Sequence, residues 1–104
     1  MVESVFKFTQ ADDKAIEKLV FDENLNYIHV VLPPGDGFPE HFSNANVYLT
    51  ILRGVISITL GEQKAVDYKG GTLLKIPEGT KMLMQNQSNK PLELIIVKAP
   101  APKN

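Results

Sequence analysis

The chemistry that this chain offers near neutral pH centres on its two histidines, His29 and His41. An imidazole can bind a metal ion or transfer a proton in this pH range. The chain has no cysteine, which excludes disulfides, a thiol nucleophile and cysteine-ligated zinc. Glu40 directly precedes His41, and a polar cluster of Ser43, Asn44, Asn46 and Tyr48 follows it. We therefore consider His41 first as the centre of a site.

The residues around His41 follow a regular spacing. Five residues separate Gly35 from His41, one separates His41 from Ser43, three lead to Val47 and six lead to Gly54. Glycine is the residue that most easily adopts the positive φ of a tight turn, so the outer two positions are expected to shape the backbone.

A second spaced run lies further along the chain. Five residues separate Gly71 from Pro77, one leads to Gly79, two lead to Met82 and three lead to Asn86. Pro77 presets φ for a turn and Gly79 permits a positive φ, so a strand is expected to reverse direction here.

Together the two runs resemble the paired motifs of the cupin family, in which two histidines, a glutamate and a third histidine hold a metal ion. The resemblance covers Tyr27 to Lys98, and the 16 residues between Gly54 and Gly71 fit the short spacer of microbial cupins. It implies an all-β fold, a double-stranded β-helix or jelly-roll barrel.

The chain retains the glycines of the two motifs but not most of the metal ligands. His41 is the one ligand that remains, since Ser43, Val47 and Met82 stand at the other three ligand positions. A hydroxyl, an aliphatic side chain and a thioether do not replace two imidazoles and a carboxylate as ligands of iron, manganese or zinc. We expect no metal and no other cofactor.

His29 leaves two alternatives open. It shares a face of its strand with Tyr27 and Val31. If that face lines the barrel, His29 joins His41 and, with Glu40, rebuilds a ligand set. Otherwise His29 lies on the outer sheet or in a subunit contact, which we favour.

The predicted barrel interior is apolar. Met82 and Met84 share one face of their segment, and Val47 is expected to face them across the barrel. Such side chains either fill a small barrel completely or line a pocket for a small apolar molecule. The predicted pocket residues are His41, Ser43, Val47, Tyr48, Met82 and Met84.

Short strands must position these residues. Runs of β-branched and apolar residues between Gly, Pro and Asn turns predict strands at 27–32, 47–52, 55–60, 63–68, 72–76, 81–85 and 92–98. Residues 13–21 fit a helix and residues 17–21 fit an edge strand, and we favour the strand. The chain is expected to be one domain, 1–104, with the barrel at 27–98 and a tail at 99–104.

Charge and composition restrict the partners. Eleven basic and twelve acidic residues give a net charge of -1, without a basic cluster, so we expect neither nucleic-acid nor membrane binding. No secretion signal is recognisable, and we expect a cytoplasmic protein. A chain this small gains stability from burying more surface, so we expect a homodimer.

Three functions fit these observations. The first is a metal-free barrel that binds a small, largely apolar ligand of unknown identity, with no assigned reaction. The second is an enzyme, either a metal-dependent oxygenase or isomerase with the rebuilt ligand set, or a metal-free isomerase or cyclase that uses His41 as a base. The third is an oligomerisation module whose barrel is filled.

Overall fold

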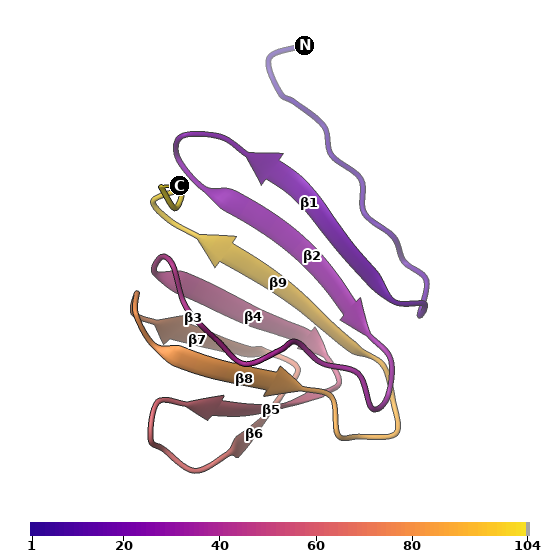
Figure 1. Ribbon diagram of the computed structural model, residues 1–104. Helices are drawn as coiled ribbons and strands as arrows, with labels where there is room; N and C mark the ends of the chain where they lie inside the picture. Colours follow the sequence, from indigo (N-terminus) through magenta and orange to yellow (C-terminus); the bar gives the residue numbers. More distant parts are fainter. Residues whose placement is uncertain (104) are drawn as a thin grey trace.

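The computed structural model describes residues 1–103 and consists of two β-sheets packed face to face (Figure 1). Its nine strands are β1 (Ala15–Phe21), β2 (Asn26–Leu32), β3 (His41–Phe42), β4 (Val47–Arg53), β5 (Val55–Leu60), β6 (Val66–Lys69), β7 (Thr72–Ile76), β8 (Lys81–Gln85) and β9 (Leu92–Lys98). This part of the chain has no helix long and apolar enough to cross a membrane.

The larger sheet has the order β1-β2-β9-β4-β7 and the smaller sheet the order β3-β8-β5-β6. All neighbouring strands in both sheets are antiparallel. Strands far apart in sequence therefore become neighbours, as β9 does when it lies between β2 and β4 (Figure 1). This arrangement is the expected all-β double-stranded β-helix.

Alternation along the strands builds the core between the sheets. Ile28 and Val30 of β2, Leu49 of β4, and Met82 and Met84 of β8 all belong to one buried cluster. Their strand neighbours point to the outer faces, because successive side chains alternate across a strand. The predicted strands form, although the strand predicted at 63–68 begins only at Val66. β3 was not predicted, because a strand of two exposed residues carries no periodic signal.

Two glycines at motif positions adopt the positive φ that the sequence predicts. Gly54 has φ +86° between β4 and β5, and Gly79 has φ +84° between β7 and β8. Gly54 additionally lies against backbone, since a Cβ there would be 2.4 Å from the carbonyl oxygen of Pro91. Gly79 has open space around it. The positive φ favours glycine at both positions, and the close approach of Pro91 is a second reason at Gly54 alone.

The hydrogen bonds of Asn86 explain why an asparagine stands at the end of the second motif. It is fully buried, and its Nδ2 donates to the carbonyl oxygens of Leu32 at 2.9 Å and Lys90 at 2.8 Å. Its Oδ1 accepts hydrogen bonds from the backbone N–H and the hydroxyl of Ser88. One amide therefore joins the end of β2 to the turn before β9 and satisfies buried backbone groups.

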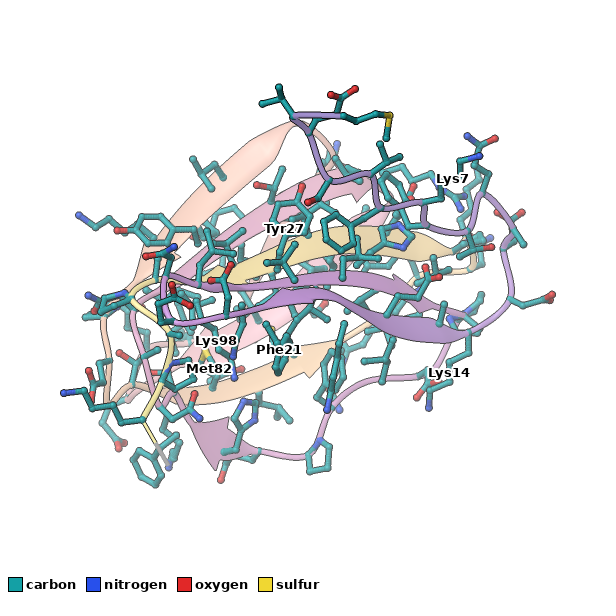
Figure 2. The ribbon with its side chains drawn as sticks, turned by 90° about the horizontal axis from the view of Figure 1, so that it is seen from above. Lys7, Lys14, Phe21, Tyr27, Met82 and Lys98 are labelled. Carbon is teal, nitrogen blue, oxygen red and sulfur yellow. The ribbon has the colours of Figure 1, made fainter. Side chains whose placement is uncertain are left out.

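Residues 1–14 run as an extended arm across the outer side of the larger sheet (Figures 1 and 2). The ring of Phe8 lies 4.3 Å from the ring of His29, and the backbone N–H of Thr9 donates to Glu17 Oε1 at 3.1 Å. At the other end of the chain, the N–H of Ala99 donates to the Asn46 carbonyl oxygen at 3.2 Å. The predicted tail extends to residue 104, which lies outside the described residues.

Candidate functional site

An apolar cavity of about 140 Å³ lies between the two sheets. The larger sheet supplies its wall from β1, β2, β4 and β9, and the smaller sheet supplies β3 and β8. Its lining residues are Ile16, Ile28, Val30, Phe38, His41, Val47, Met82, Met84, Ile96 and Lys98. Eight of these ten side chains are apolar, so the cavity favours an apolar occupant.

His41 stands at the exposed mouth of the cavity. It pairs with Met82 across β3 and β8, and directly opposed residues of an antiparallel pair share a face, so both point inward. His41 Nδ1 lies 2.9 Å from the carbonyl oxygen of Pro39. Because a carbonyl only accepts, Nδ1 carries the proton, and Nε2 is the acceptor of the neutral ring.

Four of the six predicted pocket residues line the cavity: His41, Val47, Met82 and Met84. The other two predictions need correction. Tyr48 lies on the opposite face of β4, where it is paired with Lys75 and Val97, because a strand alternates its faces. Ser43 is buried in a turn, where its hydroxyl donates to the carbonyl oxygen of Pro77 at 2.9 Å and accepts from the N–H of Thr80 at 2.9 Å.

His29 lies on the outer face of the larger sheet, under the arm, and is fully buried. Its Nδ1 is 2.8 Å from Glu17 Oε1 and its Nε2 is 2.5 Å from Glu93 Oε2. Arg53 Nε donates to the other oxygen of Glu93 at 2.8 Å, and an Arg53 terminal nitrogen donates to Asp12 at 2.7 Å. We refer to these five residues as the outer ionic network.

The rebuilt ligand set therefore does not form, because His29 and His41 point to opposite sides of the larger sheet. Glu40 is exposed to solvent. Both nitrogens of His29 face carboxylates, which only accept hydrogen bonds, so the protonated ring satisfies both contacts. His29 thus joins three strands and the arm on the outer face.

The outer ionic network stabilises the charged forms of Glu17, Glu93 and Arg53. The hydrogen bond from His29 and the N–H of Thr9 lower the pKa of Glu17. Burial opposes ionisation of Glu93, but hydrogen bonds from His29 and Arg53 outweigh it, so the pKa of Glu93 is also lowered. Hydrogen bonds to Glu93 and Asp12 raise the pKa of Arg53. These groups hold strands and arm together and do not face the cavity.

The donors at the mouth of the cavity do not fit a transition-metal ion. His41 supplies one imidazole, the Ser43 hydroxyl is engaged by the turn, and Val47 has no donor atom. The thioether of Met82 is a soft ligand that does not complete a site for zinc, iron or manganese. Within residues 1–103, no three histidine or acidic side chains gather in an arrangement suited to a metal.

Lys98 is a cavity residue that was not predicted. It is opposite Val47 in the β4–β9 pair and therefore faces inward with it. Alternation along β9 places Lys98 in register with Leu94 and Ile96 of the core, and this sequence signal could have identified it. Burial, and then the positive charge of Lys18, lower the pKa of Lys98.

These observations define a class of protein, a small double-stranded β-helix barrel with an apolar cavity open at one end. A family model described as "Cupin domain" matches residues 28–98. The chain belongs to the cupin family.

Known proteins of similar sequence and structure agree with this assignment. The chain is 42% identical to an uncharacterised protein of Methanocaldococcus jannaschii, MJ0764, over 99% of this chain and 90% of that protein. The crystal structure of MJ0764, described as an RmlC-like cupin family protein with a double-stranded β-helix fold, superposes with a TM-score of 0.93, covering 96% of this chain and 93% of that chain.

More distant structures share the fold. TT1209 from Thermus thermophilus is 22% identical with a TM-score of 0.76, covering 93% of this chain and 92% of that chain. The conserved protein SPY1581 of unknown function from Streptococcus pyogenes is 21% identical with a TM-score of 0.75, covering 91% of this chain and 80% of that chain.

Proposed function

We propose that this cupin barrel binds a small, largely apolar molecule in the cavity without using a metal ion. The observation that carries the proposal is the 140 Å³ cavity, whose wall is apolar except for His41 and Lys98. An apolar cavity of about 150 Å³ is large enough for a benzene molecule. A single ring or a short branched chain is therefore the size of ligand that fits.

Binding can be tested with toluene and the three methionine methyl groups of the chain. We expect toluene to shift the ¹³C-methyl NMR signals of Met82 and Met84, which line the cavity, and to leave Met1 unchanged, because Met1 is 97% exposed. The variant Val47→Phe places a larger side chain in the cavity wall and should raise the Kd for toluene about tenfold or more, the equivalent of about 1.4 kcal/mol.

Val66→Phe is the matched control, because Val66 is exposed on β6 of the smaller sheet and the same change adds a ring away from the cavity. Thermal unfolding of both variants checks that the barrel is intact. Equal shifts at all three methionines, or no shift at saturating toluene, would contradict binding in the cavity.

Metal independence is a separate prediction. Protein purified without chelator should contain well below one equivalent of iron, manganese, zinc or copper, because only one imidazole is offered at the motif. Elemental analysis of the wild type and of His41→Ala should give the same result. Near-stoichiometric metal that disappears in His41→Ala would overturn the metal-free proposal.

The orientation of His41 supports a second candidate, a metal-free isomerase or cyclase. The carbonyl of Pro39 holds Nδ1 so that Nε2 is the basic nitrogen, at the mouth of the cavity. Recovery of a chemically unchanged ligand after prolonged incubation favours binding, whereas an isomerised product favours the enzyme.

We propose that two copies pair through the outer face of the larger sheet. Leu73 of β7 is 62% exposed there, and Tyr27, Tyr48 and Val97 of the same face are only partly covered. Clustered apolar side chains on an outer face are typical of an interface. An isologous dimer would cover this face on both copies.

Light scattering at micromolar concentration should therefore give twice the monomer mass of 11.5 kDa. The variant Leu73→Glu should weaken the dimer, whereas Val66→Glu, exposed on β6 of the other sheet, should not. A monomeric mass for the wild type would exclude this interface.

A further inference from the structure

The cavity opens beside two lysines. Lys98 lines both the cavity and a neighbouring groove, and Lys18 of β1 lines the same groove. Ile28 also belongs to both linings, so the cavity and the groove adjoin. Figure 2 shows Lys98 and Met82 at one end of the barrel, with Phe21 of the groove nearby. A ligand in the apolar cavity would thus end next to amines.

Neither amine is neutralised by the protein. Among residues 1–103, no carboxylate lies within ion-pair distance of Lys18 or Lys98. The Nζ of Lys98 donates to the neutral amide oxygen of Asn44 at 3.1 Å, and the Nζ of Lys18 lies 5.5 Å from the centre of the Phe21 ring. The two positive charges therefore repel each other, and neither lysine has an ion-pair partner among the described residues.

One acid also lines the groove, but its contacts are local. Asp22 Oδ1 accepts the backbone N–H groups of Asn24 at 2.8 Å and Leu25 at 3.1 Å, so it closes the turn between β1 and β2. Apart from this acid and the two lysines, the side chains of the groove are apolar or neutral. An anion between the lysines would meet two cations and the amide of Asn44.

Burial of the Lys98 ammonium and repulsion by Lys18 both lower the pKa of Lys98. Both effects disfavour the charged amine, and a nearby anion reverses the second of them. A hydrogen bond between an ammonium and a carboxylate is also stronger than one between neutral groups. A bound carboxylate would therefore offset the repulsion between the ammonium groups of Lys98 and Lys18.

We propose that the ligand is a small organic carboxylate whose apolar ring or chain fills the cavity and whose carboxylate lies between Lys98 and Lys18. This inference rests on the proposed function and adds the chemical class of the ligand. The polar end faces the groove, and the ring contacts Met82, Met84 and Val47. His41 lines the cavity as well and adds an imidazole to its wall.

Matched pairs of carboxylates and neutral amides test the proposal. Benzoate and benzamide, phenylacetate and phenylacetamide, and 3-phenylpropanoate and 3-phenylpropanamide vary the distance between ring and polar end. In at least one pair, the wild type should bind the carboxylate about tenfold more tightly than the amide, as expected for a charged hydrogen bond. Calorimetry, with the Met82 and Met84 methyl signals as a second readout, measures both.

Variants locate the effect. In Lys98→Met the preference for the carboxylate should fall to about equal binding while the amide still binds, and Lys18→Met should reduce the preference as well. Lys75→Met is the control, since Lys75 lies on the outer face of β7. Thermal unfolding identifies any variant that is not folded, and in that case Lys98→Gln replaces Lys98→Met.

The outcomes separate the two proposals. If the amides bind as tightly as the carboxylates to the wild type, the carboxylate proposal is wrong and binding in the cavity stands. If toluene binds but neither member of any pair does, the carboxylate proposal fails alone, and if toluene does not bind either, the cavity function fails with it. If the preference survives in Lys98→Met, the anion lies elsewhere and this site is excluded.

Discussion

Replacing Gly54 by alanine should destabilise the barrel by about 3 kcal/mol or more, or prevent folding. A Cβ at Gly54 would lie 2.4 Å from the carbonyl oxygen of Pro91 and 2.9 Å from the Cα of Leu92. Both obstacles are backbone atoms of the segment that enters β9, the central strand of the larger sheet. Relieving the clash requires β9 to move away from the β4–β5 turn.

Gly79→Ala is the matched control. Gly79 has nearly the same φ, +84° against +86° for Gly54, but a Cβ there has no atom within 4 Å. It should cost only about 1–2 kcal/mol, the strain of a left-handed conformation in a residue with a side chain. Urea unfolding of both variants measures the difference. Equal losses would show that conformation alone, and not the close approach, makes glycine necessary at Gly54.

The second large effect is expected from the outer ionic network. The variant Glu93→Gln removes the charge that His29 and Arg53 share, and its amide turns a donor toward one of those two donors. His29 is fully buried, so the change leaves one of its ring nitrogens with a weakened hydrogen bond beneath the arm. Removing one partner of a buried ion pair typically destabilises a protein by about 3–5 kcal/mol, and we expect the lower end because Glu93 retains some solvent contact.

Asp12→Asn provides the control within the same network. Its side chain is 67% exposed, and its partner Arg53 is 40% exposed. An exposed ion pair contributes about 0–1 kcal/mol, so this variant should unfold nearly as the wild type does. If Glu93→Gln were equally mild, the contacts of His29 would be of little consequence for stability.

The pH dependence of stability follows from the same carboxylates. Hydrogen bonds from His29 lower the pKa values of Glu17 and Glu93 in the folded protein below the ordinary glutamate value of 4.5. Because folding lowers these pKa values, their stabilisation is complete above about pH 4.5 and is lost as the pH falls through the folded-state values. Unfolding free energies measured between about pH 7 and pH 3 should therefore decrease more steeply in the wild type than in Glu93→Gln.

Much of the fold was predictable because local chemistry determines it. Alternation along the strands separates Val47, Met82 and Met84 from their outward neighbours, and the glycines at turns mark where strands end. The replaced ligand positions could also be recognised from residue types, since a Val or a Ser lacks the donors of a metal site whatever surrounds it. By contrast, Tyr48 and Ser43 were misplaced, because proximity in sequence to His41 does not give the direction of a side chain.

The sequence by itself determined the barrel, its apolar lining and the single histidine at the motif. Only the tertiary structure decided which groups meet. Alternation along β2 shows which face of the sheet His29 occupies, but not that the N-terminal arm covers this face. The carboxylate partners of His29 lie 12 and 64 residues away in sequence. Lys98 and Lys18 likewise meet only because β1 and β9 flank β2. Such contacts depend on strand order and register, which are set by packing of the whole chain and not by any local segment.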